Sequence, residues 1–208
     1  MKTILCFGDS NTWGCSPDLP RRYTPEERWT MLLKAKLSGE FNVIEEGLNS
    51  RTTVLDDPYE DGKNGLSYLL PCLESHHPDL VVLMLGTNDL KSRFNLTASD
   101  ISKGAARLVQ TIQNFQHSFM TSPPKVLLVS PTHVYEVDPS KEGFYGAEAK
   151  SKELSFFYER RAKELDCYFF DAASEIEPCS KEGIHWQVDQ HAKFADILAK
   201  RIPELLLR

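Results

Sequence analysis

The sequence contains no apolar stretch long enough to cross a bilayer. Its N-terminal apolar run, residues 4–7, is too short for the hydrophobic core of a signal peptide and leads directly into Gly8 and Asp9. The five cysteines are odd in number and form no Cys-x-x-Cys pair. Without an export signal, reduced thiols are the simplest interpretation, so we expect a cytoplasmic protein that binds no membrane.

Basic runs and basic patches interleaved with aromatic residues are also missing. The chain has 24 Lys and Arg against 30 Asp and Glu, a net charge of -6. That balance argues against a surface for nucleic acid or anionic lipid. Hydrophobic residues at 41% and charged residues at 26% are ordinary for a globular protein. Without internal repeats or a low-complexity linker, the chain is predicted to form a single domain over residues 1–208.

Several familiar motifs are absent. The chain has no Gly-x-Ser-x-Gly elbow, which argues against the α/β-hydrolase fold. It has no Gly-x-Gly-x-x-Gly segment and no Walker loop, which argues against these nucleotide-binding sites. The pair His76-His77 has no acid or cysteine at ligand spacing, so we expect no metal site.

Short apolar runs alternate with segments of helical character. The runs are rich in Val, Ile, Leu and Phe, as in strands that are buried on both faces of a parallel sheet. The predicted strands are residues 3–7, 42–45, 80–85, 126–130 and 167–170, and the predicted helices are about 27–38, 64–76, 98–120, 146–166 and 189–207. Right-handed crossovers then predict an α/β three-layer sandwich with a flavodoxin-like, five-stranded parallel sheet of order 2-1-3-4-5.

Single residues refine the predicted helices. Thr97 and Asp189 are expected to cap the starts of the third and last helices. Pro71 and Pro203 should bend or interrupt the helices that contain them, because proline lacks the amide donor. His191 is expected on a solvated helix face.

Ser10 and His185 are the residues most suggestive of chemistry. Ser10 follows the first predicted strand in Gly-Asp-Ser-Asn, and His185 follows Glu182 by three residues. A serine at the mouth of a strand can act as a nucleophile, and a histidine held by a carboxylate can activate it. We therefore predict acyl transfer through a serine ester, with Glu182 orienting the imidazole. Alternatively, Glu182 is a solvated loop acid, and a backbone carbonyl, Asp171 or Glu177 holds His185.

Small or amide residues follow the second and third predicted strands. Gly47 and Asn88 stand at those positions, and the carboxyl ends of neighbouring parallel strands line one crevice. We expect the backbone N–H groups of Ser10 and Gly47 and the Asn88 amide to form an oxyanion hole. Arg51 is expected to orient the loop after Gly47 or, as an alternative, to hold a substrate carboxylate.

Residues of the long loops are candidates for substrate binding. Trp13 and Phe144 are expected to help wall an apolar slot for the acyl or alkyl group, since loops on a rigid scaffold carry function. The alternative is that each aromatic packs its loop onto the body. Asp9 and Asn11, which flank Ser10, are further candidates, although Asp9 is also expected to organise its loop through backbone hydrogen bonds.

The ordered motifs resemble the four blocks of SGNH hydrolases, the GDSL-type esterases and lipases. The blocks are Gly8-Asp9-Ser10-Asn11, Gly47, Gly86-Thr87-Asn88-Asp89 and Gly183-Ile184-His185, and the flanking segments are most similar to the arylesterase/acyltransferase branch. The family's last block usually begins with Asp, where this chain has Glu182. The resemblance implies a small-molecule ester as substrate, no metal or organic cofactor, and assembly into a homo-oligomer.

Three functions remain open at this point. The first is a serine esterase acting on small aryl or short-chain alkyl esters, with acyl transfer to alcohols implied by the branch. The second, implied by sibling branches, is a carbohydrate O-deacetylase. The third is a non-catalytic, flavodoxin-like binding module, which would not be labelled by an organophosphate.

Overall fold

Five parallel strands form the sheet of this protein. The computed structural model describes residues 1–37, 39–138 and 140–207. The strands are β1 (Lys2–Gly8), β2 (Phe41–Gly47), β3 (Leu80–Met84), β4 (Lys125–Ser130) and β5 (Tyr168–Asp171). Their order is β2-β1-β3-β4-β5 and every neighbouring pair is parallel, which confirms the predicted topology.

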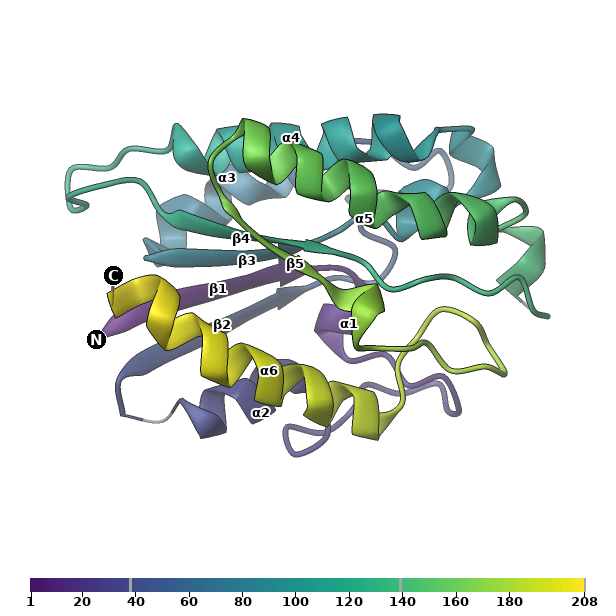
Figure 1. Ribbon diagram of the computed structural model, residues 1–208, viewed down its shortest axis with the longest axis horizontal. Coiled ribbons are helices and arrows are strands. Elements are labelled where there is room, and N and C mark those ends of the chain that lie inside the picture. The colour runs from purple at the N-terminus through teal and green to yellow at the C-terminus, as the bar shows by residue number, and fades with distance from the viewer. Residues whose placement is uncertain (38, 139, 208) are drawn as a thin grey trace.

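Helices cover both faces of the sheet (Figure 1). One outer layer holds α3 (Gly65–His76), α4 (Ala98–Gln113) and α5 (Ala147–Glu164), and the other holds α2 (Trp29–Lys36) and α6 (Val188–Leu207). Short elements fill the connections: α1 (Ser10–Trp13), η1 (Asn88–Leu90), η2 (Ser92–Phe94), η3 (Ser140–Glu142) and η4 (Ala172–Ser174). The predicted three-layer sandwich is confirmed.

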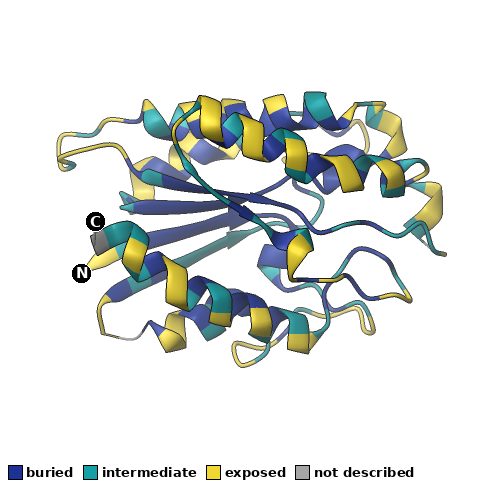
Figure 2. Cartoon of the chain, in the orientation of Figure 1, coloured by how far each residue is buried: buried dark blue, intermediate teal, exposed yellow. Residues whose placement is uncertain are grey.

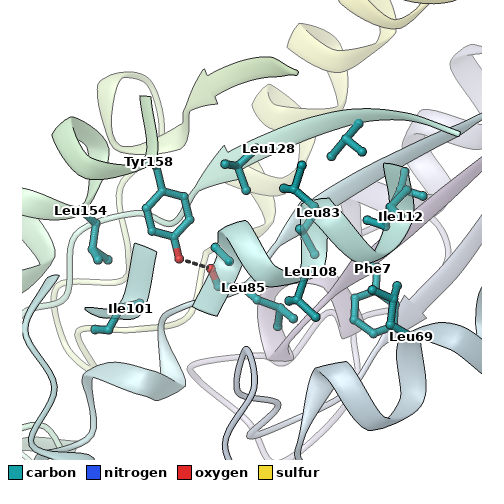
Figure 3. Packing of buried hydrophobic residues seen from close by; sticks show 14 of the residues in the cluster. Phe7, Leu69, Leu83, Leu85, Ile101, Leu108, Ile112, Leu128, Leu154 and Tyr158 are labelled. Atoms are coloured by element: carbon teal, nitrogen blue, oxygen red, sulfur yellow. Dashed lines mark hydrogen bonds between the residues drawn. The ribbon is translucent and has the colours of Figure 1, made fainter. Parts of the chain in front are cut away.

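Two apolar cores lie on the two faces of the sheet. Side chains alternate along β1, so that Leu5 and Phe7 enter one core whereas Ile4 and Cys6 enter the other. Figure 2 shows β1, β3 and β4 as the buried centre of the molecule, and Figure 3 shows the first core, which includes Phe7. The near-continuous apolar runs in the sequence therefore reflect strands with no solvent-exposed face.

The α4 helix is shorter than the sequence predicts. The expected helix over 98–120 ends at Gln113, where the Asn114 N–H still bonds the Gln110 carbonyl but the chain then leaves the helix. The apolar residues beyond that point belong to the loop before β4, so periodicity alone placed the boundary too late. Ser38, the last residue of the first predicted helix, lies outside the described residues.

The two internal prolines do not interrupt their helices. α3 continues through Pro71 and α6 continues through Pro203. Pro71 is exposed, and so is Ser67 one turn earlier, whose carbonyl loses the usual amide partner. Water can bond that carbonyl, so α3 tolerates the missing hydrogen bond.

The helix starts follow the predictions in part. Thr97 Oγ1 accepts the Asp100 N–H at 3.2 Å, which confirms the predicted cap. Asp189 is not a cap, because α6 begins at Val188; it lies in the first turn, where a negative charge favours the helix dipole. The expectation for His191 was wrong, since its side chain is fully buried.

Strand register brings the predicted site segments together. Gly8 at the end of β1 lies opposite Gly47 on one side and opposite Met84 on the other. The chain segments that follow these three strands therefore emerge together at the carboxyl ends of the strands, beside α1 (Figure 1).

Candidate active site

Ser10 is the first residue of α1 and lies just beyond the carboxyl end of β1. The Asp9 carboxylate caps this short helix by accepting the Asn11 N–H at 3.1 Å. A Cβ on Gly8 would lie 2.1 Å from Thr12 Oγ1, so only glycine lets α1 fold back onto the end of β1. Ser10 is consequently held in a fixed position with only 6% of its surface exposed.

A chain of hydrogen bonds connects Ser10, His185 and Glu182. The Glu182 Oε1 atom lies 2.9 Å from His185 Nδ1, and His185 Nε2 lies 2.8 Å from Ser10 Oγ. A carboxylate only accepts hydrogen bonds, so Nδ1–H donates to it and Nε2 is left to accept the serine hydroxyl proton. This is the arrangement that a histidine base needs to activate a serine nucleophile.

The extra methylene of glutamate is accommodated by a tight turn. The second carboxylate oxygen of Glu182 accepts the backbone N–H groups of Ile184 at 3.1 Å and His185 at 2.7 Å. Gly183, which follows Glu182, has φ of 86°, and a Cβ there would lie 2.2 Å from the Tyr135 carbonyl oxygen. The carboxylate therefore folds back over its own turn and reaches the imidazole with its other oxygen.

The electrostatics of the pair favour a charged carboxylate and a basic imidazole. Burial alone would raise the pKa of Glu182, but hydrogen bonds and charge from His185 hold that pKa below its usual value. Burial alone would lower the pKa of His185, but contact with the Cys15 thiol and with Glu182 raises that pKa above its usual value. Glu182 thus stabilises the imidazolium that forms when His185 takes a proton.

Buried polar contacts hold the Asn88 side chain in place. Asn88 Nδ2 donates to the Arg51 carbonyl at 3.1 Å. The Asp89 carboxylate next to it accepts the Thr53 N–H at 3.0 and 3.1 Å. Arg51 is 2% exposed and donates to the Gly8 carbonyl at 3.0 Å, so it orients the loop and does not present its guanidinium to a substrate.

A cavity of about 200 Å³ opens beside the serine and the histidine. The residues around it come from the segments that follow the carboxyl ends of the five strands: Ser10, Cys15, Asn49, Ser50, Asn88, Lys91, Phe144, Ile184 and His185. Phe144 is thus brought to the cavity together with Ser10, Asn88 and His185. A larger hollow of about 480 Å³ beside residues 116–123 contains none of these groups.

The remaining predicted site residues lie behind or beside this cavity and do not line it. Asn11 donates to the Ile184 carbonyl at 3.2 Å and accepts the Trp186 N–H at 3.1 Å, which ties the nucleophile turn to the histidine loop. Asp9 is buried beneath Ser10 as the cap of α1. A Cβ on Gly47 would lie 2.1 Å from the Trp13 backbone nitrogen, so this glycine gives α1 room to pack on β2.

Sequence reasoning missed several lining residues. Asn49 and Ser50 were within a segment that the sequence marks as strand-end loop, and Ser50 has a left-handed φ of 65°. Lys91 follows Asn88 by three residues, but a lysine in a polar loop carries no distinctive pattern. Cys15 also lines the cavity together with His185, and nothing in the sequence around this single cysteine marks it as a site residue.

Other features bear on membranes and metals. Within the described ranges 1–37, 39–138 and 140–207, no helix is both long and apolar enough to span a membrane. In the same ranges, no three His, Cys, Asp or Glu side chains form a group that could hold a metal ion. The structure places Cys6, Cys15, Cys72, Cys167 and Cys179 as free thiols.

Comparison with known proteins agrees with this geometry. Residues 6–193 match the GDSL-like Lipase/Acylhydrolase family. An aryl esterase of M. smegmatis is 41% identical with a TM-score of 0.94, covering 99% of this chain and 100% of that one. A carbohydrate acetylesterase from Sinorhizobium meliloti is 38% identical with a TM-score of 0.94 over the same shares. The uncharacterized lipoprotein YqeF of Bacillus subtilis is 31% identical over 86 residues, which are 41% of this chain and 31% of that protein.

The chain belongs to the family of GDSL-like lipases and acylhydrolases, the SGNH hydrolases. This confirms the resemblance drawn from the four sequence blocks. The structural relatives, an aryl esterase and a carbohydrate acetylesterase, support an ester hydrolase and match both enzymatic functions expected from the sequence.

Proposed function

We propose that this protein is a serine esterase that cleaves small carboxylic esters through an acyl-Ser10 intermediate. The single observation that carries the proposal is the continuous hydrogen-bond chain from Ser10 Oγ through His185 to Glu182. Ser10 Oγ attacks the ester carbonyl while His185 Nε2 takes its proton. His185 then gives that proton to the leaving alcohol, and water, or a second alcohol, releases the acyl group by the reverse sequence.

The proposed oxyanion site combines the Ser10 N–H, the Asn88 amide and one further backbone donor. Asn88 Nδ2 has two hydrogens and its recorded bond to Arg51 uses one of them. Gly47 does not line the cavity, whereas Ser50 does. We therefore assign the further donor to the Ser50 N–H in place of Gly47. Donors held rigidly in this way stabilise the charge that develops on the carbonyl oxygen.

The proposed substrates are short esters, because a cavity of about 200 Å³ holds about seven water-sized groups. Acetate and butyrate esters should then be cleaved faster than palmitate esters, with some transfer to added primary alcohol. The relative described as a carbohydrate acetylesterase supports a second candidate, the removal of acetyl groups from sugars. We further propose a cytoplasmic homo-oligomer that binds no nucleic acid, in line with the free thiols and the net charge of -6.

Hydrolysis of a series of p-nitrophenyl esters tests the proposal. We expect kcat/KM to peak at acetate or butyrate and Asn88→Ala to lower kcat by about a hundredfold to a thousandfold, as for other oxyanion donors. A peak at long acyl chains would contradict the small substrate. Comparing p-nitrophenyl acetate with a peracetylated sugar decides between the two candidates, since a deacetylase should prefer the sugar.

A further inference from the structure

Lys91 is an almost fully buried lysine at the wall of the active-site cavity. The residue is 7% exposed and lines the same cavity as Ser10 and Phe144. It follows directly after η1, the short helix that begins with Asn88, so its backbone is held by the turn that carries a proposed oxyanion donor. Burying an ammonium group is costly unless the charge is paired and hydrogen-bonded.

The surrounding carboxylates do not complete that pairing. Lys91 Nζ lies 3.8 Å from Glu60 Oε1 and 4.0 Å from Asp57 Oδ2, which are too far for hydrogen bonds. Asp57 Oδ2 instead accepts from Arg93 at 2.7 Å, and its Oδ1 accepts the Tyr59 N–H at 3.0 Å. Among the described residues, the Lys91 ammonium forms these two long ion pairs and no hydrogen bond, so its N–H donors can bond a ligand.

The local charge also favours an anion. Three cationic side chains, Lys63, Lys91 and Arg93, share this corner with two carboxylates, Asp57 and Glu60. The sum is one positive charge in a protein whose net charge is -6. Burial, followed by the charge of Arg93, lowers the pKa of Lys91, and a bound carboxylate would offset both effects.

We propose that Lys91 recognises a carboxylate on the substrate, and that the preferred esters are half-esters of short dicarboxylic acids. The proposal rests on the esterase function proposed above. A succinyl group has seven non-hydrogen atoms, which suits a cavity of about 200 Å³. With its ester carbonyl at Ser10, the distal carboxylate can meet the ammonium within the same cavity.

A pair of esters with matched shape isolates the charge. Monoethyl succinate carries the carboxylate, and ethyl 4-methylpentanoate replaces it with an isopropyl group of similar size and no charge. Acid release is followed in a pH-stat, with the spontaneous rate subtracted. The readout is the ratio of the two kcat/KM values within one protein preparation, so a loss of folded protein does not change it.

Three variants complete the design. Lys91→Met keeps much of the side-chain length without the charge, and Lys91→Arg keeps the charge. Lys103→Met is the matched control. Lys103 lies on the exposed face of α4 and does not line the cavity, so this substitution removes the same charge outside the site. Because a hydrogen bond between two charged groups is strong, we expect Lys91→Met to lower the ratio of kcat/KM for the succinate ester to kcat/KM for the methylpentanoate ester by about tenfold to a hundredfold. Lys91→Arg should keep part of the ratio, and Lys103→Met all of it.

Titration calorimetry with succinate gives a second readout that needs no turnover. We expect wild type to bind succinate at least about tenfold more tightly than Lys91→Met does. Equal ratios and equal succinate affinities in wild type and Lys91→Met would overturn the role of Lys91, even if both esters are cleaved. Absence of Ser10-dependent cleavage of either ester would overturn the esterase function, while a Lys91-dependent affinity would still support anion recognition.

Discussion

At the scale of single residues, Glu182 shows how a glutamate three residues before a histidine can reach the imidazole of that histidine. One carboxylate oxygen binds the backbone of Ile184 and His185, and the other binds the imidazole. The backbone contacts take up the added methylene by curling the side chain over Gly183. The same contacts restrict the carboxylate to a single orientation, as an orienting group requires.

Substitution of Glu182 should therefore lower both the rate of catalysis and the pKa of His185. We expect Glu182→Gln and Glu182→Ala to lower kcat by about a hundredfold or more, because the imidazole loses its orienting acceptor, and Glu182→Asp to keep a useful fraction. The pH-rate profile is the distinguishing readout. Because Glu182 raises the pKa of His185, the acidic limb of the pH-rate profile should move to lower pH in Glu182→Gln. Full activity in Glu182→Ala would show that another group holds His185.

The sequence was informative about residues whose chemistry is distinctive. Ser10, His185 and Asn88 were placed by motif order and now lie around one cavity. Gly47 follows a strand, which suggested an accessible amide; in the structure it allows the close approach of α1 and does not line the cavity. Lys91 could not be found from sequence, because its burial depends on the packing of loops that are distant along the chain.

At the scale of elements, the end of β3 is fastened to α5 by one buried hydrogen bond. Tyr158 OH donates to the Leu85 carbonyl at 2.7 Å (Figure 3). Leu85 precedes Gly86, whose φ of 129° turns the chain towards Asn88. The ring of Tyr158 is fully buried in the same core. This bond therefore couples the packing of a helix to the geometry of the proposed oxyanion site.

Removing that hydroxyl should cost stability in a measurable way. Tyr158→Phe leaves the Leu85 carbonyl without its buried donor, and we expect the free energy of unfolding to fall by about 1–3 kcal/mol. Urea unfolding measures this change. Tyr59→Phe is the control, because Tyr59 is 79% exposed and should change stability by less than about 0.5 kcal/mol. Equal values for the two variants would mean that the buried bond contributes little.

Most elements were predictable because their signals are local. The five strands are apolar runs with sharp polar boundaries, and each observed strand end lies within two residues of its prediction. The end of α4 was not predictable from periodicity, since apolar residues such as Phe115 continue past the helix and pack into the core from a loop. The two helical prolines do not interrupt their helices, and at Pro71 the exposed position lowers the cost of the lost hydrogen bond.

At the scale of the whole molecule, one buried histidine joins the two helices of one outer layer, α2 and α6. His191 of α6 is fully buried, and its Nδ1 accepts the Trp29 N–H at the start of α2 with an N–N distance of 3.2 Å. Burial, with the nearby charge of His185, lowers the pKa of His191 to about 3. The ring therefore remains neutral in the folded protein at pH values where an unfolded histidine is protonated.

This difference predicts acid sensitivity of the fold. Between pH 6.5 and about 3 the unfolded chain binds a proton that the folded protein excludes, so stability falls as pH falls. We expect wild type to lose about 1 kcal/mol more than His191→Asn between pH 6 and pH 5, because asparagine can accept the Trp29 N–H without titrating. Urea unfolding at both pH values gives the two slopes. Parallel slopes would contradict the assignment.

The architecture also bears on the number of folding units. We propose that residues 1–208 form one domain, because both apolar cores pack against the same five-stranded sheet. The sheet edge then acts as one rigid platform on which loops from distant parts of the chain build the cavity.

Covalent labelling of Ser10 tests the central claim most directly. Wild type, Ser10→Ala and His185→Ala are incubated with diethyl p-nitrophenyl phosphate, and the modified peptide is identified by mass spectrometry over time. The account predicts a single diethylphosphoryl adduct on Ser10, no adduct in Ser10→Ala, and labelling slowed by about a thousandfold in His185→Ala. An adduct on another residue, or a wild type that is not labelled at all, would contradict it.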